Sequence, residues 1–126
     1  MPAVQDGTRR AMLVLKFGGT SVGSAAAFRN AAALVERVVP RDPVVVVSAL
    51  AGVTDLLVRF AAEPAARRDL AARFVTRHEE LARELGVQAM ALEDELAAWD
   101  AAARACYEIG HGLTPRDKDR ILSFGE

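Results

Sequence analysis

Two short apolar runs, with an amphipathic segment between them, open the chain. Residues 13–17 read LVLKF and residues 44–48 read VVVVS, and continuous apolar runs of this length predict strands that are buried on both faces. Residues 25–38 between them show helical spacing, with Ser24 placed as the N-cap and Pro40 just beyond the end. Two strands joined by one helix predict a parallel pair, and the loops after both strands then open at the same edge of the sheet.

Helical spacing dominates the remainder of the chain. We expect a short helix that begins at Thr54 as its N-cap and ends near residue 62. A longer helix should start with Pro64 in its first turn and run to Leu85, where Gly86 ends it. Together with the first unit, these helices give the chain the pattern of an α/β protein.

The helical region predicts an antiparallel hairpin. A further helix over about residues 88–109 carries apolar side chains at alternating intervals of four and three, the spacing of a helix that packs against a partner. The apolar positions of the two helices are Leu70, Phe74, His78, Leu81 and Leu85 in one and Leu92, Leu96, Trp99, Ala103 and Cys106 in the other. We interpret the charged positions as a solvated face. They are Arg67, Arg68, Arg73, Arg77, Glu79, Glu80 and Glu84.

The last part of the sequence indicates an incomplete domain. Thr114 and Pro115 predict a new helix, which reaches Glu126 without a cap. Two strands are also too few, because a parallel sheet needs cover on both faces and sheets commonly have about five strands. We therefore expect residues 12–126 to be the N-terminal portion of a larger α/β domain, cut within a helix, and residues 1–11 to be a disordered leader without a function.

Composition and charge exclude several kinds of protein. A net charge of -1 with 52% hydrophobic residues fits a globular domain and does not predict binding to nucleic acid. The first residues lack the apolar stretch of a secretory signal, and no run approaches the roughly 18 apolar residues of a membrane span. The single cysteine, Cys106, cannot form an internal disulfide and is expected in the core. We therefore expect a cytoplasmic protein with no nucleic-acid or membrane partner.

A lysine, Lys16, interrupts the first apolar run just before Gly18 and Gly19. A buried cation is costly unless its ammonium emerges beside an anion, and bare glycine amides before a helix N-terminus form a site for anions. The pattern therefore predicts that Lys16 and this loop bind a phosphate chain. The spacing is neither a Walker loop, in which the lysine follows the glycines, nor GxGxxG. The alternative is a tight turn that needs glycine, with Lys16 reaching solvent.

The second loop, residues 48–55 after the second apolar run, and the last residues carry further polar groups on the same predicted edge. Ser48 and Thr54 flank Gly52 ahead of a helix N-terminus, which would suit a small anionic substrate. The alternative is that Thr54 caps the helix and Ser48 only ends the strand. Glu126 lies with Ser123 on the late helix, and the alternative there is an ordinary surface acid.

Taken together, three motifs resemble those of aspartate kinases in the amino acid kinase family. They are KFGGTSVG at residues 16–23, VVSALAGVTD at residues 46–55 and SFGE at residues 123–126. They stand in the family's order, with a helical hairpin between the second and the third, and cover nearly all of the chain from Met12. Glutamate 5-kinases and acetylglutamate kinases share the fold, but these motifs are most similar to those of aspartate kinases. The resemblance implies a three-layer α/β/α fold, of which this chain holds the N-terminal portion.

The resemblance implies ATP-dependent phosphorylation of the side-chain carboxylate of L-aspartate to 4-phospho-L-aspartate, without a covalent enzyme intermediate. This reaction is the first step toward lysine, threonine and methionine. The resemblance implies that Lys16 is the catalytic residue and stabilises the phosphoryl group during its transfer. It also implies a phosphate site lined by Lys16, Gly18, Gly19, Thr20 and Ser21. The physics agrees, because the carboxylate and the γ-phosphate repel each other unless positive charge and N–H donors meet them.

The resemblance also implies the substrate contacts: Ser48 and Thr54 touch the aspartate, and Glu126 holds its ammonium group. Mg²⁺ is implied with ATP, but no metal ligand can be assigned in this chain. The family holds adenine and ribose with the second half of its domain, and feedback acts through further domains. We therefore expect the fragment alone to lack turnover and the complete enzyme to be a homo-oligomer. The alternatives are a non-catalytic phosphate- or nucleotide-binding module and another amino acid kinase, such as a glutamate 5-kinase.

Overall fold

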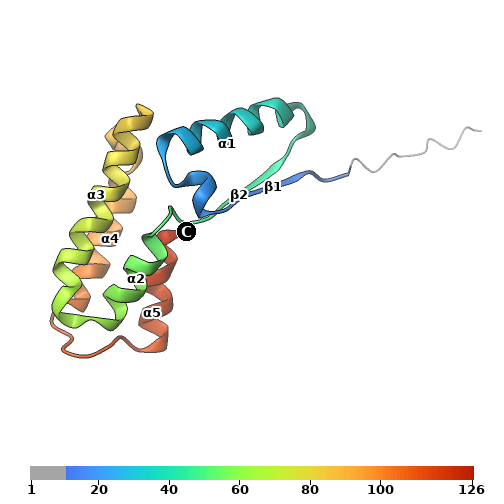
Figure 1. Cartoon of the computed structure of the whole chain (residues 1–126). Coiled ribbons are helices and arrows are strands. Elements are labelled where there is room, and N and C mark those ends of the chain that lie inside the picture. Colours follow the sequence, from blue (N-terminus) through green and yellow to red (C-terminus); the bar gives the residue numbers. More distant parts are fainter. Residues whose placement is uncertain (1–10) are drawn as a thin grey trace, which may run out of the picture.

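A strand–helix–strand unit followed by a group of helices makes up the chain (Figure 1). The computed structural model describes residues 11–126, so the leader expected over residues 1–11 lies almost wholly outside the described residues. The unit consists of β1 (Val14–Phe17), α1 (Ala25–Val38) and β2 (Val44–Val47). The two strands pair in parallel, which confirms the prediction made from the single connecting helix.

Helix α1 begins and ends where the sequence predicts. The side chain of Ser24 accepts a hydrogen bond from the amide of Ala27 at 3.2 Å and so caps the first turn. The helix ends at Val38 and continues into a short 3-10 helix, η2 (Val39–Arg41). Side chains of the unit form a small core of their own. It consists of Phe17, Val22 and Ala31, with Leu15, Phe28, Val35 and Leu50 packed against it.

The expectation that both strands are buried on both faces is wrong for the described chain. The four valines of β2 are 40 to 47% exposed, and Val14 of β1 is 54% exposed. Side chains alternate between the faces of a strand, so Leu15 and Phe17, which pack against α1, lie on one face and Val14 and Lys16 on the other. Figure 1 shows the remaining helices gathered beyond the ends of the strands rather than over the sheet. The described residues therefore leave β2 exposed, although its four consecutive valines are typical of a strand that is buried on both faces.

Four helices follow the second strand, and their bounds correct several expectations. They are α2 (Val53–Ala62), α3 (Arg67–Leu85), α4 (Glu93–Cys106) and α5 (Pro115–Leu122). Thr54 is not the N-cap of α2, because Gly52 takes that position with a φ of 82°. Pro64 opens a separate 3-10 turn, η3 (Pro64–Ala66), and not the long helix itself. The helix expected over residues 88–109 is shorter, with the 3-10 turn η4 (Ala89–Ala91) before it.

Helices α3 and α4 form the predicted antiparallel hairpin. Trp99 of α4 is buried and donates from its indole nitrogen to the carbonyl oxygen of Ala71 at 3.3 Å. Its ring lies 4.4 Å from the ring of Phe74 and 5.3 Å from that of Phe60, measured between centroids. A second ring pair, at 5.4 Å, joins Trp99 to Phe124 after α5. This aromatic cluster therefore ties α2, α3, α4 and the end of the chain into one core.

One charge of the hairpin is not solvated as we expected. Arg67 is fully buried, because it lies three and seven residues before Leu70 and Phe74, on the apolar side of α3. Its guanidinium donates to backbone carbonyl oxygens alone. They belong to Phe60, Ala61, Cys106, Ile109 and His111. These carbonyls lie at or beyond the ends of α2 and α4, where helices leave acceptors unpaired and carry partial negative charge, so Arg67 holds both ends together.

Candidate functional site

The glycine loop, residues 18–23 after β1, contains a short 3-10 helix. Gly18 is extended, η1 (Gly19–Val22) follows, and the amide of Ser21 donates to the carbonyl oxygen of Gly18 at 2.9 Å. Val22 is 1% exposed and anchors the loop in the small core, while Thr20 and Ser21 are exposed. The loop then enters the capped first turn of α1. Four of the five residues predicted to line a phosphate site, Gly18, Gly19, Thr20 and Ser21, thus lie together ahead of a helix N-terminus, while the fifth, Lys16, lies on β1.

The glycine loop packs directly against the second loop. A Cβ atom on Gly19 would lie 3.3 Å from the carbonyl oxygen of Ala49, and one on Gly23 would lie 3.0 Å from Cβ of Ala51. The amide of Ser48 donates to the carbonyl oxygen of Phe17 at 3.0 Å and continues the parallel pairing into the loops. Both loops therefore lie at one edge of the sheet, as the strand–helix–strand unit predicts.

Lys16 lies on β1 opposite Val46 of β2 and is exposed. It forms no salt bridge with any other residue in the range 11–126. Leu15 and Phe17 pack against α1, so the side chain of Lys16 between them projects from the opposite face of the sheet, which α1 does not cover. Neither Lys16 nor Gly18 or Gly19 lines the cavities beside the two loops, although Ser21 lines one of them, so a hollow shared by Lys16 and the glycine amides stays a prediction.

The second loop carries the hydroxyl groups that were expected at the substrate. Ser48 is partly buried, and its Oγ donates to the carbonyl oxygen of Ala49 at 3.0 Å. Thr54 is exposed in the first turn of α2, and no side chain caps this helix. The N-terminus of α2 and the hydroxyl of Thr54 are therefore open to a ligand, whereas Ser48 is oriented by its own loop.

The SFGE segment lies against the second loop. After α5 the chain forms η5 (Ser123–Gly125), and a Cβ on Gly125 would lie 3.3 Å from Cβ of Ala49 and 3.4 Å from Cγ1 of Val53. Glu126 follows the turn rather than lying on a helix. It lines a cavity of about 300 Å³. The other lining residues are Phe74, His78, Leu92, Glu95, Leu96, Ser123 and Phe124. The three sequence motifs are thus contiguous in space, with the second loop in the middle.

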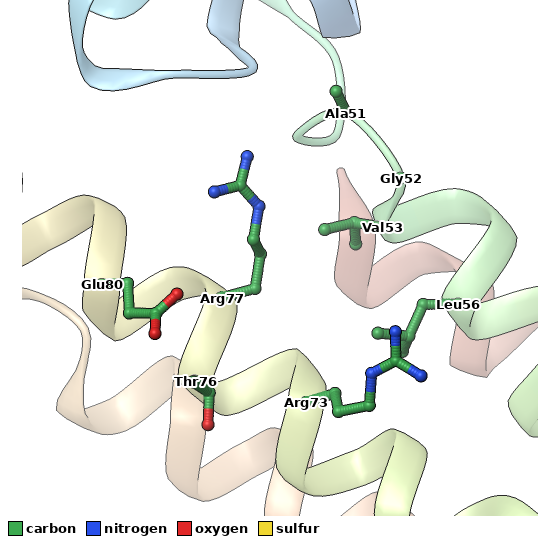
Figure 2. Close-up of a pocket in the computed structure, with 8 residues that line it drawn as sticks. All are labelled: Ala51, Gly52, Val53, Leu56, Arg73, Thr76, Arg77 and Glu80. Atoms are coloured by element: carbon green, nitrogen blue, oxygen red, sulfur yellow. The ribbon is translucent and has the colours of Figure 1, made fainter.

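A larger cavity, about 350 Å³ in volume, separates the second loop from α3 (Figure 2). Its walls are formed by Ala51, Gly52, Val53, Leu56, Arg73, Thr76, Arg77 and Glu80. Figure 2 shows Arg77 extending from α3 toward the loops, while Arg73 extends toward Leu56 on α2. Arg77 donates from Nη2 to the carbonyl oxygen of Gly23, the last residue of the glycine loop. Sequence reasoning missed this contact, although residue 77 lies three after Phe74 and four before Leu81 and so flanks the buried stripe.

Three further features of the described chain concern metal binding, membrane spans and its single cysteine. No group of three or more His, Cys, Asp and Glu side chains in residues 11–126 is arranged to hold a metal ion. None of the helices formed by the same residues is long and apolar enough to cross a membrane. Cys106 is buried as expected, and desolvation raises the pKa of its thiol, with Arg67 opposing the shift.

Comparisons with known proteins find similarity to a single family. The model of the amino acid kinase family matches residues 11–124. Over 118 residues the chain is 41% identical to an aspartokinase of Chlamydia trachomatis, and the match covers 92% of this chain and 25% of that protein. An aspartokinase of Chlamydia muridarum is 38% identical over 119 residues, which cover 94% and 25% of the two chains. The chain thus spans about a quarter of the length of the curated relatives it matches.

Solved structures agree with the fold. Escherichia coli aspartokinase III in complex with aspartate and ADP, in its R-state, superposes with a TM-score of 0.71 at 30% identity. The same enzyme with lysine and aspartate, in its T-state, gives 0.68 at 30% identity. Each match covers 91% of this chain and 26% of the other. The α/β fold of the described residues is therefore that of one part of these larger proteins.

Proposed function

Because the chain belongs to the amino acid kinase family, we propose that it is the N-terminal portion of an aspartate kinase domain, over residues 12–126. The reaction is transfer of the γ-phosphoryl group of ATP to the side-chain carboxylate of L-aspartate. The observation that carries the proposal is the contact of three motifs. The second loop contacts the glycine loop on one side and the SFGE segment on the other. The names of the similar proteins, all aspartokinases, support the choice of substrate.

The glycine loop and Lys16 form the phosphoryl half of the proposed site. Gly18, Gly19, Thr20 and Ser21 lie on one exposed turn, where amide N–H groups and hydroxyls can bind phosphate oxygens. The ammonium of Lys16 supplies positive charge as negative charge develops on the transferring oxygens.

The second loop and Glu126 form the acceptor half. The hydroxyls of Ser48 and Thr54 and the open N-terminus of α2 suit a carboxylate. The carboxylate of Glu126 pairs with the α-ammonium group and favours an amino acid over a plain dicarboxylic acid. Gly125, the residue before Glu126, packs on Ala49 of the second loop, which supports this assignment.

ATP reaches kinases as a complex with Mg²⁺, which neutralises phosphate charge. Residues 11–126 contain no group of three or more His, Cys, Asp and Glu side chains arranged to hold a metal ion, and we assign no ligand of Mg²⁺ within them. By resemblance to aspartate kinases, we propose that adenine, ribose and the feedback effector are bound by parts of the enzyme other than residues 11–126. The same holds for contacts of a homo-oligomer. We place the activity in the cytoplasm, at the start of lysine, threonine and methionine synthesis.

The experiment is an assay of the protein at the length that its gene encodes. Incubation with Mg·ATP and L-aspartate, with hydroxylamine to trap the acyl phosphate, should yield aspartyl hydroxamate and an equal amount of ADP. L-Glutamate and N-acetyl-L-glutamate serve as matched acceptors and should give at least tenfold less product. Preference for either of them would make the protein another amino acid kinase. ATP binding without transfer to any acceptor would make it a phosphate-binding module.

A further inference from the structure

An arginine of the helical hairpin reaches the end of the glycine loop. Arg77 lies 54 residues from Gly23 along the chain, and its Nη2 donates to the Gly23 carbonyl oxygen. Arg77 is half-buried and forms no salt bridge with another residue in the range 11–126. A hydrogen bond from a charged donor is roughly twice as strong as a neutral one, so a single bond can hold this peptide group.

The bonded carbonyl lies at the most crowded point of the loop. A Cβ on Gly23 would lie 3.0 Å both from the carbonyl oxygen of Gly19 and from Cβ of Ala51. The peptide that follows Gly23 leads into Ser24, which caps α1. The orientation of this peptide therefore sets how the glycine loop meets both the second loop and the helix.

A second arginine contact shows that the hairpin supports the first unit at two points. Arg29 of α1 donates from Nη2 to the carbonyl oxygen of Glu84 near the end of α3. This contact is exposed and joins α1 to the end of α3, whereas Arg77 bonds to the loop itself. Of the two contacts, only the one from Arg77 can fix the backbone of the glycine loop.

We propose that Arg77 is a positioning residue, which holds the glycine loop in the geometry that binds the phosphates. The inference rests on the proposed function and adds to it a residue outside the three motifs. In this assignment Arg77 acts on the backbone of the loop and not on the reacting atoms. It acts by fixing the Gly23 carbonyl and, through it, the amides of Gly18 and Gly19. A displacement of about 1 Å at a reacting group costs about a hundredfold in rate, so loss of one such anchor is measurable.

The test compares Arg77→Met with Arg73→Met in the protein at its encoded length. Arg73 is a matched control, because it lies one turn earlier on α3, lines the same cavity, and makes only a long contact of 3.9 Å to Asp69. In Arg77→Met we expect kcat/KM for ATP to fall about tenfold to a hundredfold. KM for aspartate should stay within about twofold, and Arg73→Met should keep all parameters within about twofold. Arg77→Lys retains a donor for the single bond to Gly23 and should recover most of the loss.

Amide hydrogen exchange over residues 18–24 gives a readout that does not depend on catalysis. It should rise in Arg77→Met and stay unchanged in Arg73→Met. Wild-type kinetics or unchanged exchange in Arg77→Met would overturn the inference. So would a loss that affects ATP and aspartate equally, follows the fraction of unfolded protein and is not recovered by Arg77→Lys. Failure of the proposed function is a separate result, since the unmodified protein would then make no aspartyl phosphate.

Discussion

At the scale of single residues, Lys16 is the most informative position. It is a cation within an apolar strand, exposed on the face of the sheet that α1 does not cover, and unpaired with any described acid. The alternative of a side chain that only reaches solvent predicts the same exposure. The proposed role in phosphoryl transfer differs from it in predicting an effect on turnover.

Replacement of Lys16 by alanine should therefore lower kcat about a hundredfold or more, the usual loss for one donor to a transition-state charge. Steady-state kinetics of the full-length protein measures it. Lys118→Ala is the control, since it removes the only other lysine, which is exposed on α5. Unchanged turnover in Lys16→Ala would remove this residue from the chemistry.

Glu126 makes a different prediction, because it is assigned to the substrate and not to the phosphates. Glu126→Gln keeps the size of the side chain and loses its charge, so KM for aspartate should rise at least about tenfold, the loss expected for one charged partner. KM for ATP should change less than about twofold. Glu95→Gln, in the wall of the same cavity, is the control. An effect of Glu126→Gln on ATP alone contradicts the assignment.

Cys106 predicts a chemical property rather than a rate. Burial raises the pKa of its thiol, so at a given pH the folded protein holds less thiolate than a free cysteine would. Iodoacetamide at pH 8 should therefore label the native protein much more slowly than the urea-unfolded protein. Equal labelling rates would show that α4 opens readily around this position.

At the scale of elements, the helix ends decide where the polar motifs lie. Thr114 caps α5 by accepting from the amide of Asp117 at 3.2 Å, and its hydroxyl donates to the carboxylate of Asp117. This cap fixes the start of the helix that leads to the SFGE segment.

Thr114→Ala should lower the free energy of unfolding by about 1 kcal/mol, the typical value of an N-cap. Thermal or urea unfolding measures it. Thr76→Ala is the control, since Thr76 is exposed within α3 and alanine favours a helix interior. An equal loss in both variants would mean that the cap contributes nothing specific.

Element prediction from the sequence succeeded where one local signal decided the outcome. Ser24, Thr114 and Gly86 fix helix ends through a hydroxyl or a positive φ, and the structure confirms all three. It failed where two signals competed. Thr54 is a good cap by residue type, but Gly52 can adopt a positive φ and starts α2 earlier.

Contacts between residues far apart in the sequence could not be predicted from local sequence signals. Arg67 and Arg77 differ little from their charged neighbours in sequence, and only the docking of α2, α4 and the glycine loop gives them carbonyl partners. The periodicity placed both near the apolar stripe of α3, which would have marked them had charge not been taken as a sign of exposure. The contact of the three motifs was predicted in part, through the shared edge of a parallel sheet.

At the scale of the whole molecule, the sheet is the weakest part of the described chain. It has two strands, and all four valines of β2 are at least 40% exposed. A two-stranded sheet is marginal alone, and an apolar edge of this kind pairs readily with other chains.

We therefore expect the 126-residue chain by itself to self-associate at micromolar concentration. Sedimentation velocity should show species larger than the 13.5 kDa monomer. The double change Val44→Thr and Val46→Thr keeps the strand propensity while reducing apolar surface, and should shift the distribution toward monomer. A compact monomer at all concentrations would contradict the expectation.

The central claim is that the glycine loop, the second loop and the SFGE segment form one site for a phosphate chain and an amino acid. The most direct measurement is a crystal structure of the protein, at its encoded length, with ADP and L-aspartate. We predict the terminal phosphate within about 3 Å of the amides of the glycine loop. The aspartate should lie between the second loop and Glu126. Either ligand bound elsewhere, with the glycine loop unoccupied, would contradict the account.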